Sequence, residues 1–345
     1  MEKAKKILRN LIIFIILIVL TFYIVFKERS LSDIITTVSG VKKEFIFIAF
    51  ICMCLYFVCD AINIRRTLKV LKEKTTFLKS LKYSLIGFFF SAITPAASGG
   101  QPMQIYYMYK DKIRVANSTL TLLINLSCVQ IVTLSIAFIS LFFNYKYLNN
   151  SLIWLFLLGV TLNLMALALL LVSILSKRMT KTLINLAVKV LKFFRVKNIE
   201  NKQEKLESEL AKYHDSAVYI KNHKLMVLKT LITTYIQFLL FYSISYWVYR
   251  SFGLSEYNIL EITTMQAVLY ATVSGIPSPG AVGVSEGGFI GIFSKIFSET
   301  TIHSAMLLNR GINFYLFVMI SAIVVIINTM IKKKDDINIK EEKME

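Results

Sequence analysis

The apolar residues of this chain fall into long runs separated by short polar connections. A helix needs about 20 mostly apolar residues to cross a bilayer, and six runs have that length. They lie at residues 8–26, 45–64, 115–142, 151–176, 225–250 and 303–331. The first run follows a basic start, lacks a small-residue cleavage site and ends at Lys27-Glu28-Arg29, which favours a retained first helix over a signal peptide. The pattern predicts an all-α, polytopic integral membrane protein with about six full spans.

Two further apolar stretches are interrupted. One breaks over residues 94–102 and the other over residues 277–283, and the four prolines of the chain all lie in these breaks. Proline removes a backbone donor and glycine weakens a helix. Irregular backbone at membrane depth is tolerated only where protein or a water-filled cavity satisfies it. We therefore expect two re-entrant hairpins or broken helices that line a cavity, or eight spans in all; the alternative is kinks that serve packing alone.

The two breaks resemble each other. Thr94-Pro95-Ala96-Ala97-x-Gly99 aligns with Ser278-Pro279-Gly280-Ala281-x-Gly283 at a shift of 184 positions, which also superimposes the flanking runs. The charge pattern starts the first copy outside and the second inside. This arrangement is typical of an inverted-topology repeat, whose paired broken helices meet near the bilayer midplane. Coincidence between two turns rich in glycine and proline is the alternative.

Charge sets the expected orientation. The formal net charge is +19, and the basic residues gather at 65–114 and in the connection 177–224. Basic connections stay in the cytoplasm, so we expect a cell-membrane protein with both termini cytoplasmic and no nucleic-acid partner. Residues 1–331 then form one membrane domain and 332–345 a charged tail. Within the basic connection, Lys181, Lys192 and Arg195 share one face of an expected amphipathic helix on the anionic inner leaflet; a solvated regulatory loop is the alternative.

The candidate substrate path consists of the break residues and two charged groups. Half-helices that resume near Gln104 and Glu286 would turn bare N–H groups toward an anion such as a lipid phosphate. Glu286 is a candidate to hold a cationic headgroup or a coupling proton, or simply to cap its own helix. Arg310 is a candidate to pair with Glu286, to grip a phosphate, or to extend to the interface. The full set is Pro95, Gly99, Gly100, Gln101, Pro102, Gln104, Pro277, Pro279, Gly280, Gly283, Glu286 and Arg310.

Other polar residues in the runs have ordinary explanations. Asn125 and Gln130 are expected to hydrogen-bond to a neighbouring helix. Asp60 is expected to form an interfacial ion pair with Arg65 or Arg66. The four cysteines are expected to pack as small residues, without a disulfide or metal. No arrangement of residues indicates a catalytic site, a cofactor or a metal site.

The two breaks resemble those of the lysylphosphatidylglycerol synthase transmembrane-region family. The matching residues are Pro95-x-x-x-Gly99-Gly100-Gln101-Pro102 and Pro279-Gly280-x-x-Gly283-x-x-Glu286, with Arg310 in the last span. Position 101 is Gln here where many relatives carry Glu, and position 104 is Gln where some carry a basic residue. The likeness extends from the first span to about residue 331.

The resemblance implies a flippase-like membrane domain that moves phosphatidylglycerol-type or aminoacylated phospholipid between leaflets. In full-length relatives a separate soluble domain transfers lysine from lysyl-tRNA, and only a short charged stretch follows residue 331 here. Two alternatives stay open. The chain is a phosphatidylglycerol lysyltransferase involved in resistance to cationic peptides, by itself or as the membrane subunit of a separately encoded synthase, or it transports another lipid-linked precursor.

Overall fold

A computed structural model describes residues 39–94, 97–144, 150–175, 222–276 and 278–341, with short pieces at residue 36 and residues 217–219. Every regular element in these ranges is a helix. The elements are α3 (Lys43–Val70), α4 (Phe77–Ala92), α5 (Gly100–Lys110), α6 (Val115–Asn144), α7 (Asn150–Leu175), α10 (Lys224–Ser251), α11 (Ile259–Val273), η3 (Pro279–Ala281), α12 (Val284–Phe293), α13 (Ile302–Arg310), η4 (Gly311–Tyr315) and α14 (Leu316–Glu341).

Five stretches of helix are long and apolar enough to cross a membrane. They are Lys43–Val70, Val115–Phe142, Ile153–Val172, Lys224–Ser251 and Ile302–Thr329. Each coincides with one of the six predicted spans, which confirms the all-α, polytopic membrane class. The remaining prediction, 8–26, lies outside the described residues, as do Pro95, Pro277 and the three basic residues of the expected amphipathic helix.

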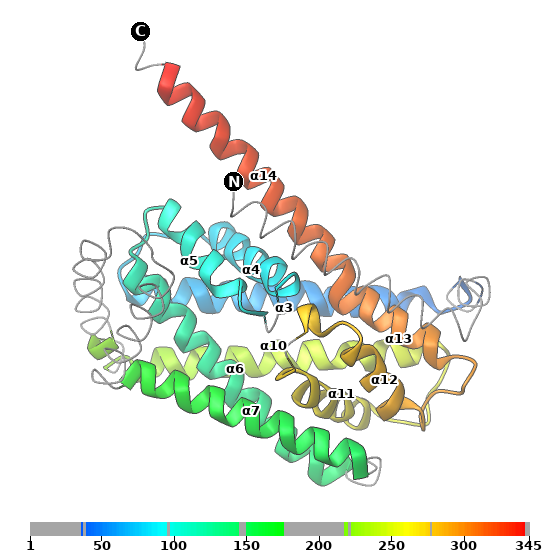
Figure 1. Cartoon of the computed structure of the whole chain (residues 1–345). Coiled ribbons are helices and arrows are strands. Elements are labelled where there is room, and N and C mark those ends of the chain that lie inside the picture. Colours follow the sequence, from blue (N-terminus) through cyan, green and yellow to red (C-terminus); the bar gives the residue numbers. More distant parts are fainter. Residues whose placement is uncertain are drawn as a thin grey trace, which may run out of the picture.

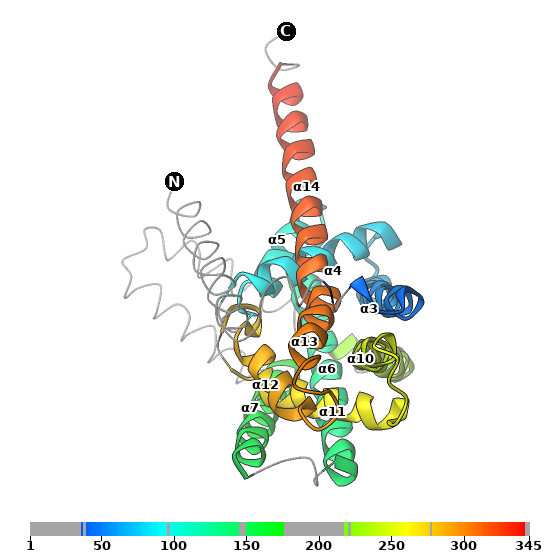
Figure 2. The same ribbon diagram turned by 90° about the vertical axis from the view of Figure 1, so that its right-hand side faces the viewer.

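The helices α3 and α10 form an antiparallel pair that lies along one side of the molecule (Figures 1 and 2). The amide of Lys42, at the start of α3, donates to the carbonyl of Ser251 at the end of α10, over 2.8 Å. At the other end of the pair, the Asn63 side chain donates to Thr234 over 3.1 Å. The direction of the pairing is the one that an inverted repeat requires for its first members.

Two helical hairpins accompany this pair. The helices α4 and α5 pack against each other on the side of α3, whereas α11 and α12 form the second hairpin near α10 (Figures 1 and 2). At the turn of each hairpin an alanine has the left-handed backbone: Ala97 and Ala281 both have a φ of 52°. The amide of each donates to the carbonyl three residues earlier, Thr94 or Ser278, over 3.2 Å. The two turns thus share their geometry at the aligned positions.

The last span is not a uniform α-helix. α13 passes into α14 through η4, a π-helical turn, and α14 continues well past the other helices (Figure 1). Such turns occur often at functional sites because they reorient side chains within a helix. Here the turn follows Arg310 directly and contains Asn313, so it sets how these two polar side chains are placed relative to each other.

Candidate functional site

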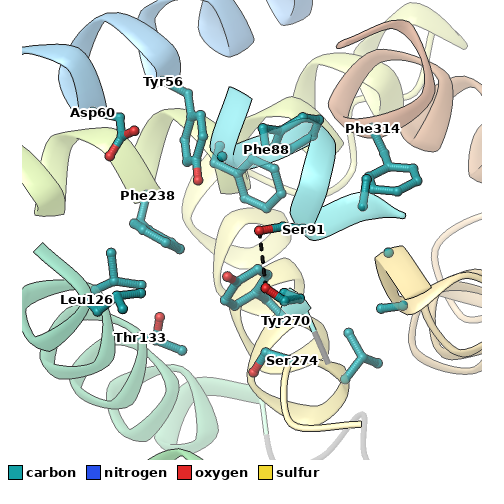
Figure 3. Close-up of a pocket in the computed structure, with 18 of the residues that line it drawn as sticks. Tyr56, Asp60, Phe88, Ser91, Leu126, Thr133, Phe238, Tyr270, Ser274 and Phe314 are labelled. Atoms are coloured by element: carbon teal, nitrogen blue, oxygen red, sulfur yellow. Dashed lines mark hydrogen bonds between the residues drawn. The ribbon is translucent and has the colours of Figure 1, made fainter. Parts of the chain in front are cut away.

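The first break forms a tight turn between α4 and α5. The Thr94 hydroxyl accepts from the amide of Gly99 over 2.9 Å, and it donates to the carbonyl of Phe90 over 2.6 Å. A Cβ on Gly100 would lie 2.0 Å from the Oγ of Ser91, so only glycine allows the two arms to approach this closely. Ser91 also donates across the turn to the carbonyl of Ala97 over 3.5 Å (Figure 3).

The sequence placed the start of the resuming half-helix near Gln104, but α5 begins at Gly100. Gln104 is therefore one turn inside the helix. Its side-chain amide donates to the carbonyl of Tyr83 over 3.1 Å, and Gly87 leaves the space that this side chain fills. Gln101, which is half-buried, lies in the first turn instead, and the exposed Pro102 follows it without an amide proton to leave unsatisfied.

The second break is built around two glycines with positive φ. Gly280 has a φ of 60° inside η3, and a Cβ there would lie 2.3 Å from the ring of Phe314. Gly283 has a φ of 85° and directly precedes α12. Both positions require the left-handed region that side chains disfavour. The sequence prediction of a broken helix at this place is confirmed.

Glu286 and Arg310 form a buried ion pair that ties this break to the last span. The Nε of Arg310 donates to Oε1 of Glu286 over 2.8 Å, and a second guanidinium nitrogen donates to the carbonyl of Gly280 over 3.1 Å. Tyr315 also donates to Oε1 over 2.9 Å, while Oε2 accepts from the amide of Gly283 over 2.7 Å. Glu286 is 2 % exposed and Arg310 9 %. Glu286 therefore both pairs with Arg310 and caps α12, two roles that the sequence offered as alternatives.

A cavity of about 710 Å³ lies where the two hairpins meet (Figure 3). Nine α-helices (α3 to α7 and α10 to α13) and both breaks contribute to its wall. Its polar lining consists of Tyr56 and Asp60 of α3, Ser84 and Ser91 of α4, Gln101 and Gln104 of α5, Asn125, Gln130 and Thr133 of α6, Asn163 of α7, Gln237 of α10, Gln266, Tyr270, Ser274, Ser278 and Ser285 of the second hairpin, and Asn309, Arg310 and Asn313 of the last span. Because Gln101 and Ser285 lie in the first turns of α5 and α12, two helix N-termini border the cavity.

Several polar atoms on this wall have no hydrogen-bond partner among the described residues. They include both side-chain polar atoms of Asn125, the side-chain oxygens of Gln130, Gln237 and Asn313, and the hydroxyl of Ser278. The expectation that Asn125 bonds to a neighbouring helix was wrong for the described residues, and the side-chain oxygen of Gln130 has no such bond either; both residues line the cavity instead. Buried polar atoms without partners are costly, so this lining suits water or a polar ligand.

Asp60 corrects the sequence interpretation most strongly. Within the described residues its carboxylate forms no ion pair; it accepts from the hydroxyl of Ser84 and faces the amide of Gln237. Residues face each other on a helix at spacings of three or four, and Arg65 and Arg66 are five and six positions away. Arg66 instead donates to Asn63 and Thr233. The helical spacing was the signal in the sequence that argued against the expected pair.

The match to a family model extends over most of this architecture. Residues 7–321 match the description "Lysylphosphatidylglycerol synthase TM region". The chain belongs to the lysylphosphatidylglycerol synthase transmembrane-region family. The matched range contains both hairpins and the whole cavity wall, so the site described here lies within the part of the chain that defines membership.

A curated relative agrees with this assignment. The chain is 22% identical over 295 residues to a protein of Pyrococcus horikoshii described as a UPF0104 membrane protein, and the match covers 83% of this chain and 87% of the relative. The transmembrane-region family and the five long apolar helices make the chain a multi-pass membrane protein of a lipid-related family.

Proposed function

We propose that the protein moves a membrane phospholipid of the phosphatidylglycerol or aminoacylated type between leaflets, with the cavity as the path of the headgroup. The observation that carries the proposal is the cavity itself. It is lined by unpartnered amides and hydroxyls at the point where two broken hairpins meet inside a membrane domain. A headgroup that crosses a bilayer needs such a lining, because it otherwise loses its hydration without compensation.

The electrostatics of one wall suit a lipid phosphate. The N-terminal turns of α5 and α12 border the cavity through Gln101 and Ser285, and helix N-termini attract anions. Arg310 borders the same cavity, with its charge balanced by Glu286. In this proposal Gln101, Ser285 and Arg310 contact the phosphate, while the glycines and prolines of the breaks hold the half-helices open toward it.

The outer surface of the domain suits the acyl chains. Large apolar side chains are exposed along α3, α7, α10 and α14, among them Phe47, Trp154, Ile232 and Ile323. A lipid whose headgroup occupies the cavity keeps its tails against such a surface. We further propose a cell-membrane location with cytoplasmic termini, supported by the basic connections, and contact of Lys181, Lys192 and Arg195 with anionic lipid at the inner leaflet.

The test is transport by purified protein in vesicles. Fluorescent phosphatidylglycerol is placed in both leaflets, and an impermeant quencher reports the outer fraction over time. The proposal expects movement much faster than in protein-free vesicles of the same composition. Folded protein that moves neither phosphatidylglycerol nor its aminoacylated form would contradict it.

Substituting Asn125 with leucine separates function from folding. In the described part of the chain both side-chain polar atoms of Asn125 lack a partner, so an apolar residue of similar size should raise the free energy of unfolding by about 1 kcal/mol. The same change removes a polar contact from the headgroup path and should slow lipid movement several-fold. Denaturation and vesicle transport measure the two effects. If the variant is more stable but moves lipid at the same rate as the wild type, Asn125 does not contact the headgroup.

A further inference from the structure

Asp60 is a carboxylate in a place where an isolated negative charge is costly. It lies ten residues before the end of α3, about 15 Å along a helix axis, within a stretch that is long and apolar enough to span a bilayer. Its hydrogen-bond partners, Ser84 and Gln237, are neutral. A charge at such depth is normally paired or neutralised, and no partner in the described part of the chain does this for Asp60.

The neighbouring wall of the cavity has aromatic faces. The ring of Tyr56 lies 6.0 Å from that of Phe238, which lies 5.6 Å from that of Tyr270, measured between centroids. All three rings and Asp60 line the cavity, and Figure 3 shows Tyr56 and Phe238 in the neighbourhood of Asp60. Aromatic faces attract cations, so the rings and the carboxylate favour the same kind of ligand.

The unpartnered atoms on the wall of the same cavity are chiefly acceptors. The side-chain oxygens of Asn125, Gln130 and Gln237 border the same cavity without a donor. A primary ammonium group carries a positive charge and three N–H donors and has no acceptor. It therefore complements this part of the wall in charge and in hydrogen bonding.

The groups around Asp60 leave its charge uncompensated. On α3 the titratable neighbours are Tyr56 and Cys59, and Tyr270 of α11 lies beyond Tyr56. The helices α4 and α10 present the neutral side chains of Ser84 and Gln237. None of these groups is a cation, so the site is electrically balanced only when Asp60 holds a cation of its own.

We propose that Asp60 binds one cation at a time, either a proton or the primary ammonium group of a lipid headgroup. The exchange keeps the charge of the Asp60 site constant: an entering ammonium group displaces the proton to water, and its departure lets a proton return. Movement of an amine-bearing lipid is then coupled to proton movement in the opposite direction. This inference rests on the proposed lipid translocation and adds its energy source.

The test uses vesicles with a stable pH difference across the membrane and with the membrane potential held at zero by potassium and valinomycin, because exchange of a zwitterionic lipid for a proton moves one net charge. The probe is phosphatidylethanolamine labelled on its acyl chain, and labelled phosphatidylglycerol, which has no amine, is the comparison. A one-for-one exchange should shift the leaflet ratio of the amine lipid by about tenfold per pH unit, with the lipid gathering in the leaflet that faces the more acidic side. Phosphatidylglycerol should stay evenly distributed.

Three variants make this result specific to the residue. Asp60→Asn should lose the dependence on the pH difference, whereas Asp60→Glu should keep it. Asp111→Asn is the matched control, since Asp111 is paired with Lys82 and accepts a hydrogen bond from Tyr83 away from the cavity; this variant should behave as the wild type.

If the wild type distributes both lipids equally regardless of the pH difference, the proposed exchange is wrong and lipid translocation stands. Absence of movement of either lipid overturns translocation and, with it, the exchange.

A direct measurement covers the case in which Asp60→Asn folds poorly. Infrared difference spectra of the wild type should contain a carboxylic-acid band that disappears when phosphatidylethanolamine is added, and Asp60→Glu should shift that band. A band that neither responds to the amine lipid nor shifts in the variant would overturn the assignment.

Discussion

Replacing Arg310 with methionine should lower the free energy of unfolding by about 3–5 kcal/mol, because it leaves a buried carboxylate without its counter-charge. Glu286 is 2 % exposed, and Tyr315 and the amide of Gly283 cannot neutralise it. The carbonyl of Gly280 also loses its donor. Methionine keeps much of the length of the arginine stem, so lost packing contributes little to the difference. Denaturation in detergent, followed by circular dichroism, measures the effect.

Two further variants test whether the unpaired charge is the cause. Adding Glu286→Gln to Arg310→Met removes that charge and should restore part of the stability, although Glu286→Gln alone is destabilising. Arg250→Met is the matched control: this arginine lies 5.3 Å from the ring centre of Phe45 and donates to Tyr246, and among the described residues it forms no ion pair with a carboxylate. The Arg250→Met substitution should lower the free energy of unfolding by about 1 kcal/mol or less. Equal losses for Arg250→Met and Arg310→Met would refute the role of the buried pair.

The spans and breaks were predictable because local physics determines them. The bilayer fixes the length of a spanning helix, so the apolar runs alone located α3, α6, α7, α10 and the last span. Proline and glycine act on their own backbone, so the sequence also located both hairpin turns. The shared left-handed alanines at 97 and 281 agree with the alignment of the two breaks, although alanine itself does not favour that conformation.

The composition of the cavity wall could not be predicted in the same way. Whether Asn125 finds a partner depends on the distance to a facing helix, and the sequence carries no measure of that distance. Asp60 was assigned to nearby arginines because they are close in sequence, whereas its true neighbours, Ser84 and Gln237, come from α4 and α10. The ion pair of Glu286 and Arg310 was predictable in part. The sequence identified both residues as candidates, but only the structure shows that they pair with each other and that Glu286 also caps α12.

Substituting Gly159 with alanine should lower the free energy of unfolding by about 1–3 kcal/mol and slow lipid movement. Its Cβ would lie 2.3 Å from the carbonyl oxygen of Ala271 and 2.9 Å from the Cα of Thr272, so the obstruction is backbone that cannot rotate away. Small residues allow membrane helices to approach this closely. The added methyl group would force α7 and α11 apart, and this overpacking lowers the free energy of unfolding. The contact between α7 and α11 also includes the bond from Asn163 to Ser274, 3.0 Å long.

The reason for a loss of transport is that this contact fixes one wall of the cavity. Asn163 of α7 and Tyr270 of α11 both line it, so a displaced α7 changes the width of the path. Gly287→Ala is the matched control, because a Cβ there meets no atom within 4 Å. This substitution should leave the free energy of unfolding unchanged or raise it by about 0.5–1 kcal/mol, since alanine has a better helix propensity than glycine. Denaturation and vesicle transport of the two variants give the comparison. Similar behaviour of both would mean that α7 moves freely against α11, and the headgroup path would then need a different wall.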